Sequence, residues 1–170
     1  MRPRYGYGFF SVDSTGEFRQ KILFFYWDPD RELYRSTSTP LGKKHETETM
    51  RTNMQAFVDS EKILVNRKSV KARVLHVDIG FISSKKRPYV EFLITFKGDL
   101  VKGINTYENY YEREKVEYSY RVTWTFPENF KVIKADVGFP YEVIDGRIIV
   151  FNVEKGAETP GYEVIEFLVL

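Results

Sequence analysis

The sequence contains no cysteine among its 170 residues. This absence excludes a disulfide framework, a thiolate metal site and a cysteine nucleophile. Glutamine is also scarce, occurring only at Gln20 and Gln55, whereas Glu and Lys are abundant. Heat-adapted proteins show the same shift from thermolabile amides and thiols toward charged side chains. The composition therefore favours an intracellular protein of a heat-adapted organism.

Long apolar runs are also missing. The N-terminal residues MRPRYGYGFFSVD lack the apolar stretch of ~7–15 residues that a secretory signal requires. No segment reaches the ~20 consecutive apolar residues that span a bilayer. From these absences we expect a cytoplasmic protein without a membrane partner. The length suits one ordinary domain, so we expect residues 1–170 to form a single domain in which sub-halves 1–98 and 115–170 share one core.

Aromatic residues, by contrast, are abundant. They make up 16% of the chain, and aromatic and β-branched side chains favour strands. The clearest strand signal is KVEYSYRVTWTF, residues 115–126, in which every second residue is apolar. This alternation predicts a strand with one buried face, and that face includes Trp124. Pro127 lacks a backbone donor and therefore ends the expected strand.

Other stretches alternate in the same way or form apolar runs between turn-forming residues. A hairpin is expected around residues 13–16. Asp145-Gly146 is a strong signal for a second hairpin, because both of its turn positions need a positive φ. Residues 70–82 are expected to bury Leu75, Val77, Ile79 and Phe81. The expected strands are residues 5–12, 18–27, 62–65, 70–82, 89–97, 115–126, 130–137, 141–144, 147–153 and 162–170.

Apolar residues at helical spacing predict two helices, over residues 47–60 and residues 100–111. The polar residues 31–48 are expected to form a long surface loop. With many strands and few helices, the predicted fold class is mainly β, of the β-rich α+β kind. We expect an antiparallel β-sandwich or a strongly curved sheet with one or two short helices.

Residues that carry chemistry are few. His76 and Asp78 lie two apart in an expected strand, so their side chains share a face. They are weak candidates for metal ligands or for a base with its orienting carboxylate, because a polar pair on a wet face is the commoner arrangement. The acidic residues of 46–48 and 112–117 are interleaved with basic ones, as on solvated surfaces. No phosphate loop, nucleophile elbow or dinucleotide fingerprint is present, and we expect neither a cofactor nor a metal.

Charge is unevenly distributed along the chain. Residues 1–87 contain 17 Lys and Arg against 10 Asp and Glu, and residues 88–170 contain 9 against 14. The basic half suits a polyanion, but it equally suits attraction to the acidic half. The candidate nucleic-acid-binding residues flank the two ends of the expected hairpin 70–97 and need not form one patch. They are Arg67, Lys68, Lys71, Arg73, Lys85, Lys86 and Arg87.

No motif identifies a family or a reaction. The sequence favours a non-enzymatic protein that works by self-association or by binding a protein partner. Residues 5–10 and 22–27 present more apolar surface than one sheet face readily covers, and the chain ends in an apolar strand, so we predict a homodimer. Two alternatives stay open. One is a nucleic-acid-binding protein, and the other is a hydrolase-type enzyme that uses dispersed carboxylates with His76 and Asp78.

Overall fold

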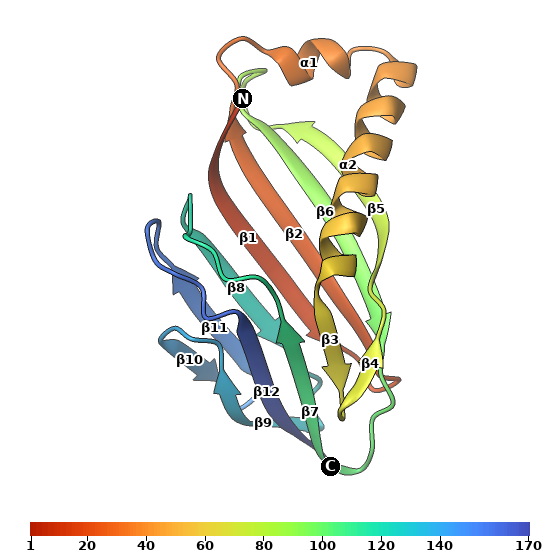
Figure 1. Ribbon diagram of the computed structural model, residues 1–170, viewed down its shortest axis with the longest axis vertical. Helices are drawn as coiled ribbons and strands as arrows, with labels where there is room; N and C mark the ends of the chain where they lie inside the picture. Colours follow the sequence, from red (N-terminus) through yellow and green to blue (C-terminus); the bar gives the residue numbers. More distant parts are fainter.

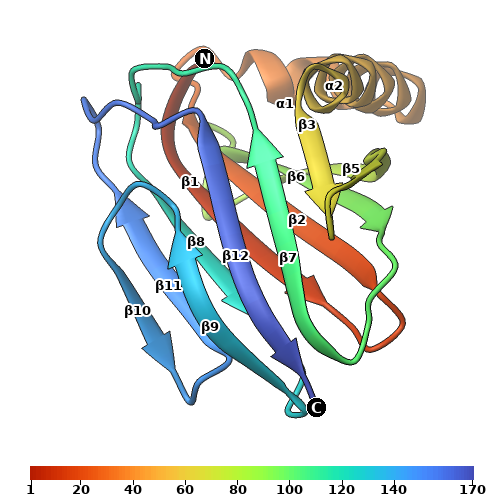
Figure 2. The same ribbon diagram turned by 60° about the horizontal axis from the view of Figure 1, so that its bottom comes forward.

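Two β-sheets face each other in the computed structural model, which describes residues 1–170 (Figures 1 and 2). The larger sheet has the strand order β10-β11-β8-β1-β2-β6-β5, and the smaller has β4-β3-β7-β12-β9. Aromatic rings join them, since the ring centroids of Trp124 and Tyr107 are 4.8 Å apart and those of Phe126 and Phe167 are 5.0 Å apart. This arrangement confirms the mainly β, sandwich-like fold class. The elements are β1 (Arg2–Val12), β2 (Glu17–Trp27), α1 (Glu32–Ser36), α2 (Pro40–Ser60), β3 (Lys62–Val65), β4 (Lys68–Val70), β5 (Arg73–Phe81), β6 (Pro88–Lys97), β7 (Gly103–Tyr110), β8 (Tyr120–Thr125), β9 (Phe130–Asp136), β10 (Tyr141–Ile144), β11 (Ile148–Val153) and β12 (Tyr162–Val169).

Strands β1 and β2 form the predicted hairpin in the middle of the larger sheet. Strand β1 pairs on its other side with β8, and this pairing is parallel, whereas the other pairings between strands are antiparallel. Strand β8 is also shorter than predicted. Residues before it leave the sheet, and the amide of Val116 instead donates to the carbonyl of Ala157 at 2.8 Å. Trp124 is fully buried, as the alternation predicted.

Helices α1 and α2 replace the predicted surface loop over residues 31–48. Helix α2 begins at Pro40, and the hydroxyl of Thr39 caps it by accepting a hydrogen bond from the Gly42 amide at 3.1 Å. Thr followed by Pro is a helix-start signal, but it stands within a polar run that has no apolar stripe. The apolar residues of α2 that pack on the core lie from its middle onward and include Met54 and Val58, whereas Leu41 near its start is exposed.

Residues 103–110 form strand β7, where the sequence predicted a short helix. The inner face of this strand carries Asn105, Tyr107 and Asn109, all buried, while Ile104 is 61% exposed. A strand that buries polar residues and exposes an apolar one does not show the usual alternation. The helical spacing of its few apolar residues was therefore misleading.

A β-bulge changes the predicted inner face of β5. The register between β5 and β6 shifts between Val74 and His76, so Leu75 turns outward and is 43% exposed. Val74 is buried in its place. After the bulge, Val77 and Ile79 face the core as predicted.

Strand β12 lies between β7 and β9, so the apolar terminal strand is paired on both edges within the chain. The Asp145-Gly146 turn between β10 and β11 has φ values of 52° and 65°, which confirms the predicted hairpin. Neither helix combines the length and the apolar character that crossing a bilayer requires.

Candidate functional site

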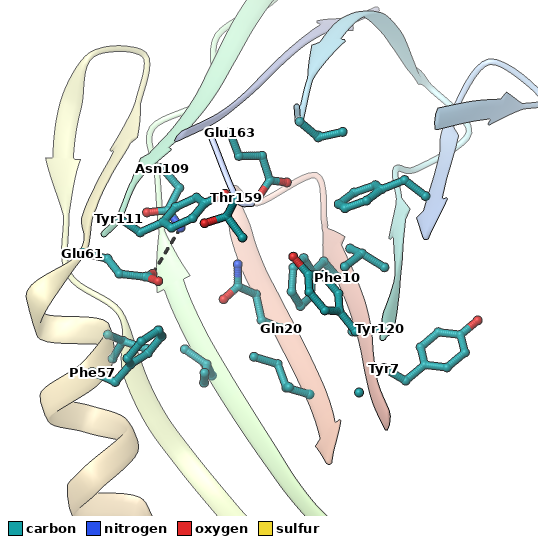
Figure 3. A pocket seen from close by; sticks show the side chains of 18 of the residues that line it. Tyr7, Phe10, Gln20, Phe57, Glu61, Asn109, Tyr111, Tyr120, Thr159 and Glu163 are labelled. Carbon is teal, nitrogen blue, oxygen red and sulfur yellow. Dashed lines mark hydrogen bonds between the residues drawn. The ribbon is translucent and has the colours of Figure 1, made fainter. Parts of the chain in front are cut away.

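A cavity of about 430 Å³ lies between the inner face of the larger sheet, the smaller sheet and α2 (Figure 3). Small-molecule sites typically measure ~300–1,000 Å³. Most of the lining residues are apolar or aromatic, and they come from both sheets and from the helix. Among them are Ile22 and Phe24 of β2, Met54 and Phe57 of α2, and Ile94 of β6.

Two glycines of β1 lie on the inner face of the larger sheet and line the cavity. A Cβ atom at Gly6 would lie 3.1 Å from the Cβ of Tyr120, and one at Gly8 would lie 3.0 Å from the ring of Phe10. Neither glycine has a positive φ, so their role is to leave space rather than to permit a turn. The missing side chains let aromatic rings approach the β1 backbone and keep the cavity open.

Polar side chains gather at one end of the cavity, opposite Phe10 and Tyr120 (Figure 3). Asn109 of β7 and Glu163 of β12 are cross-strand partners. The Nδ2 atom of Asn109 donates to Oε2 of Glu61 at 3.1 Å. The indole Nε1 of Trp124 donates to Oε1 of Glu163 at 2.8 Å. Asn109 thus bonds the carboxylate of Glu61, at the end of α2, and lies opposite Glu163 on the neighbouring strand.

Two buried polar atoms of the cavity lining lack a hydrogen-bond partner. They are the hydroxyl of Tyr107, a residue 1% exposed, and Oδ1 of Asn109, a residue 8% exposed. An unpaired buried polar group costs about 1–3 kcal/mol, so each one calls for an explanation. Because both residues line the cavity, a molecule bound there can supply the missing partners.

The electrostatic potential at the polar end is negative, because Glu61, Glu114 and Glu163 line the cavity and no Lys, Arg or His side chain does. Burial raises the pKa of Glu163 to about 7; the Trp124 hydrogen bond opposes the rise and the charge of Glu61 adds to it. Burial likewise raises the pKa of Glu61. Burial, followed by the charges of Glu163 and Glu61, raises the pKa of Tyr111 to about 12. These causes show that the acidic groups act on one another.

His76 and Asp78 lie outside the cavity, on the edge strand β5. His76 is exposed, and Asp78 forms an ion pair with Lys43 of α2 at 2.9 Å. The structure places no three His, Asp or Glu side chains where they could together hold a metal ion. The pair therefore acts in the structure as a polar surface group.

The candidate nucleic-acid-binding residues form two separate groups. Lys68 lies near one end of β5, where it pairs with Asp99 at 3.6 Å, together with Arg67, Lys71 and Arg73. The turn between β5 and β6, at the other end of β5, carries Lys85, Lys86 and Arg87. The Nζ atom of Lys85 lies 4.2 Å from the centre of the Tyr34 ring. The length of a strand thus separates the two groups, as the sequence implied.

Sequence reasoning did not single out Glu61, Asn109 or Glu163. A signal existed for Glu163, because it shares the inner face of β12 with the fully buried Ile165 and Phe167. A carboxylate at an inward position of an apolar strand is unusual and marks a candidate site. Asn109 carried no such signal, since its strand was predicted to be a helix.

No protein-family description matches the sequence, and no curated protein is similar to it. Among solved structures, the chain is similar to the folded domain of LppM from Mycobacterium tuberculosis, with 8% identity, a TM-score of 0.47 and coverage of 99% of this chain and 92% of that one. It is also similar to an aminopeptidase N family protein from Idiomarina loihiensis, with 11% identity and a TM-score of 0.42. That match covers 95% of this chain but only 29% of the other. At these TM-scores the similarities carry no functional argument.

Proposed function

We propose that this protein is a non-enzymatic binding protein whose cavity takes a small, mostly apolar ligand. The cavity itself carries the proposal, because its volume of about 430 Å³ combines apolar walls with one polar end. A few polar groups in an apolar pocket fix the orientation of a ligand. The unpaired atoms of Tyr107 and Asn109 support the presence of a polar ligand group at that end. Binding is favoured over hydrolysis because His76 and Asp78 lie outside the cavity.

Filling the cavity should weaken ligand binding. We expect Gly8→Val to weaken binding of the neutral fluorescent probe N-phenyl-1-naphthylamine by at least about tenfold, equivalent to 1.4 kcal/mol. The new side chain would begin 3.0 Å from the Phe10 ring and force that ring into the cavity. Titration of the probe, followed by its fluorescence, measures the effect.

The matched control for this experiment is Ser11→Val, on the outer face of the same strand. This variant should bind the probe like the wild type, and thermal melts should show both variants folded at the assay temperature. The proposal fails if the wild type does not bind the probe, or if Gly8→Val and Ser11→Val bind it equally well.

A second proposal concerns self-association through the outer face of the larger sheet. Phe9 is 44% exposed and stacks on Tyr7, with ring centroids 4.1 Å apart and planes within 4°. Most neighbouring outward positions on β2 and β6 are also apolar, with the ion pair of Lys21 and Glu91 (3.8 Å) among them. Apolar patches of this kind mark interfaces. The outward apolar residues of these three strands are Tyr5, Tyr7, Phe9, Leu23, Phe25, Trp27, Tyr89 and Leu93.

We expect light scattering at micromolar concentration to give twice the monomer mass. Phe9→Lys should shift the mass toward the monomer, because it places a charge within the outer aromatic face. Ile133→Lys, which replaces a 50% exposed residue of β9 in the smaller sheet, is the control and should leave the dimer intact. A monomer mass for the wild type would reject self-association.

The abundant Glu and Lys and the scarce Gln support the further proposal that the protein is intracellular and heat-adapted.

A further inference from the structure

The polar end of the cavity carries acidic groups without basic partners. Glu61 and Glu163 each accept one hydrogen bond, from the Asn109 amide and the Trp124 indole respectively, and neither forms an ion pair. Glu114 adds a third carboxylate to the cavity lining at its exposed rim. Neutral donors stabilise carboxylates less than cations do. The protein itself therefore provides no positive charge to balance these carboxylates.

Tyrosine side chains line the same cavity as these carboxylates. Tyr107 and Tyr111 of the smaller sheet, and Tyr118 and Tyr120 on the larger-sheet side, all line the cavity. Figure 3 shows Tyr111 beside Glu61 and Asn109, with Glu163 close by. Aromatic faces attract cations, and cages of aromatic rings bind quaternary ammonium groups. Rings and carboxylates together offer two kinds of attraction to one positive charge.

The unpaired atoms of the lining agree with this character. The buried Oδ1 of Asn109 is an acceptor only, so a donor such as an ammonium N–H can satisfy it. The Tyr107 hydroxyl is also without a partner and lies on the same face of β7, two residues away. The Asn109 oxygen calls for a ligand group that donates a hydrogen bond, and the Tyr107 hydroxyl can either donate or accept.

We infer that the ligand of this cavity carries an amino or alkylammonium group, which binds between Glu61 and Glu163 against the tyrosine rings, while its apolar part occupies the rest of the cavity. This inference rests on the proposed function, since it specifies the ligand of the same cavity. The absence of any basic lining residue makes the cavity a poor site for a carboxylate or phosphate ligand.

Proton binding should compete with the cation. Burial gives Glu163 a pKa of about 7, so this carboxyl is largely neutral in mildly acidic solution and ionised in mildly basic solution. A cation favours the ionised form, so its affinity should rise with pH through this range. The titratable groups that face Glu163 from the surrounding elements are all acidic or phenolic, so none supplies a competing positive charge. They are Glu61, Tyr107, Tyr111, Glu114 and Tyr120.

Three probes with the same alkyl chain test the inference by competition with the neutral fluorophore. They are octylammonium, 1-octanol and octanoate, which are cationic, neutral and anionic. At about pH 8 the cation should bind at least about tenfold more tightly than the alcohol, and octanoate should bind most weakly. At about pH 5.5 the advantage of the cation over the alcohol should shrink several-fold, because Glu163 is then protonated.

The decisive variant is Glu163→Gln, which keeps an oxygen to accept the Trp124 hydrogen bond and removes the charge. It should lower the affinity for the cation about tenfold at pH ~8, a much larger effect than on the affinity for 1-octanol. Glu112→Gln is the matched control, because Glu112 is exposed, lies in the adjacent loop and does not line the cavity.

The possible results separate the two proposals. If 1-octanol binds but the cation has no advantage, or if octanoate binds best, the inference about charge is wrong and the apolar binding function stands. If none of the three probes displaces the fluorophore, the binding function is rejected as well. A cation advantage that disappears in Glu163→Gln and persists in Glu112→Gln supports both.

Discussion

Replacing Trp124 by Ala should lower the free energy of unfolding by about 3–5 kcal/mol. Trp124 is fully buried, and its ring packs against Phe10, Tyr107 and Phe126 with centroid distances of 5.2, 4.8 and 5.9 Å. Its removal leaves a large void between the two sheets. It also removes the donor to Glu163, leaving a partly buried carboxylate without its hydrogen bond. Denaturant unfolding followed by circular dichroism measures the change.

The only other tryptophan provides the control. Trp27 is 37% exposed at the end of β2, so Trp27→Ala should change the free energy of unfolding far less. Equal unfolding midpoints for the two variants would show that Trp124 does not lie at the contact between the sheets.

Glu163→Gln should stabilise the protein near neutral pH. The pKa of Glu163 is about 7 in the folded protein and 4.5 ordinarily, so between these values the folded state binds more protons than the unfolded state. Stability of the wild type therefore falls as pH rises from about 4.5 to 7 and changes no further from this group above that range. This difference in pKa corresponds to a loss of at most about 3 kcal/mol in the free energy of unfolding. The value is an upper bound, because Glu163 is only partly buried and water screens its charge.

The glutamine variant lacks this titration. We expect it to exceed the wild type by about 1–3 kcal/mol at pH ~8, and the difference to disappear below pH ~4.5, where Glu163 is protonated in both states. Chemical denaturation at a series of pH values measures both quantities. A constant difference between the two proteins across this range would mean that Glu163 titrates normally. A gain in stability from removing this charge would also indicate that the Glu163 carboxylate has a role other than folding.

Local patterns in the sequence predicted much of the larger sheet. The alternation in Val90, Phe92, Ile94 and Phe96 has a period of two because a strand sends successive side chains to opposite faces, and all four residues are buried. The Asp145-Gly146 turn was predictable for a similar reason, since its backbone angles depend on the two residues themselves. Where the period was interrupted, as at Leu75 beside the bulge, the prediction of the buried face was wrong.

The candidate site was not predictable in this way. Gly6 and Gly8 leave space beside β1, but nothing local in the sequence indicated that this space belongs to a cavity. The inward asparagines and tyrosine of β7 contradict the apolar pattern expected of a buried face. They are stable there because part of that face meets other polar groups and the cavity rather than a sealed core.

The sequence by itself determined which stretches extend, which positions turn and that the chain builds mainly β-structure, because these depend on neighbours a few residues apart. Only the tertiary structure decided that β1 pairs in parallel with β8, and that Glu61, Asn109 and Glu163 meet at one end of a cavity. Alternation indicates that a side chain faces the interior, but it does not indicate which residues that side chain contacts. The partner depends on strand order, which brings together residues separated by about one hundred positions, and contacts across such loops are set by the packing of the whole chain.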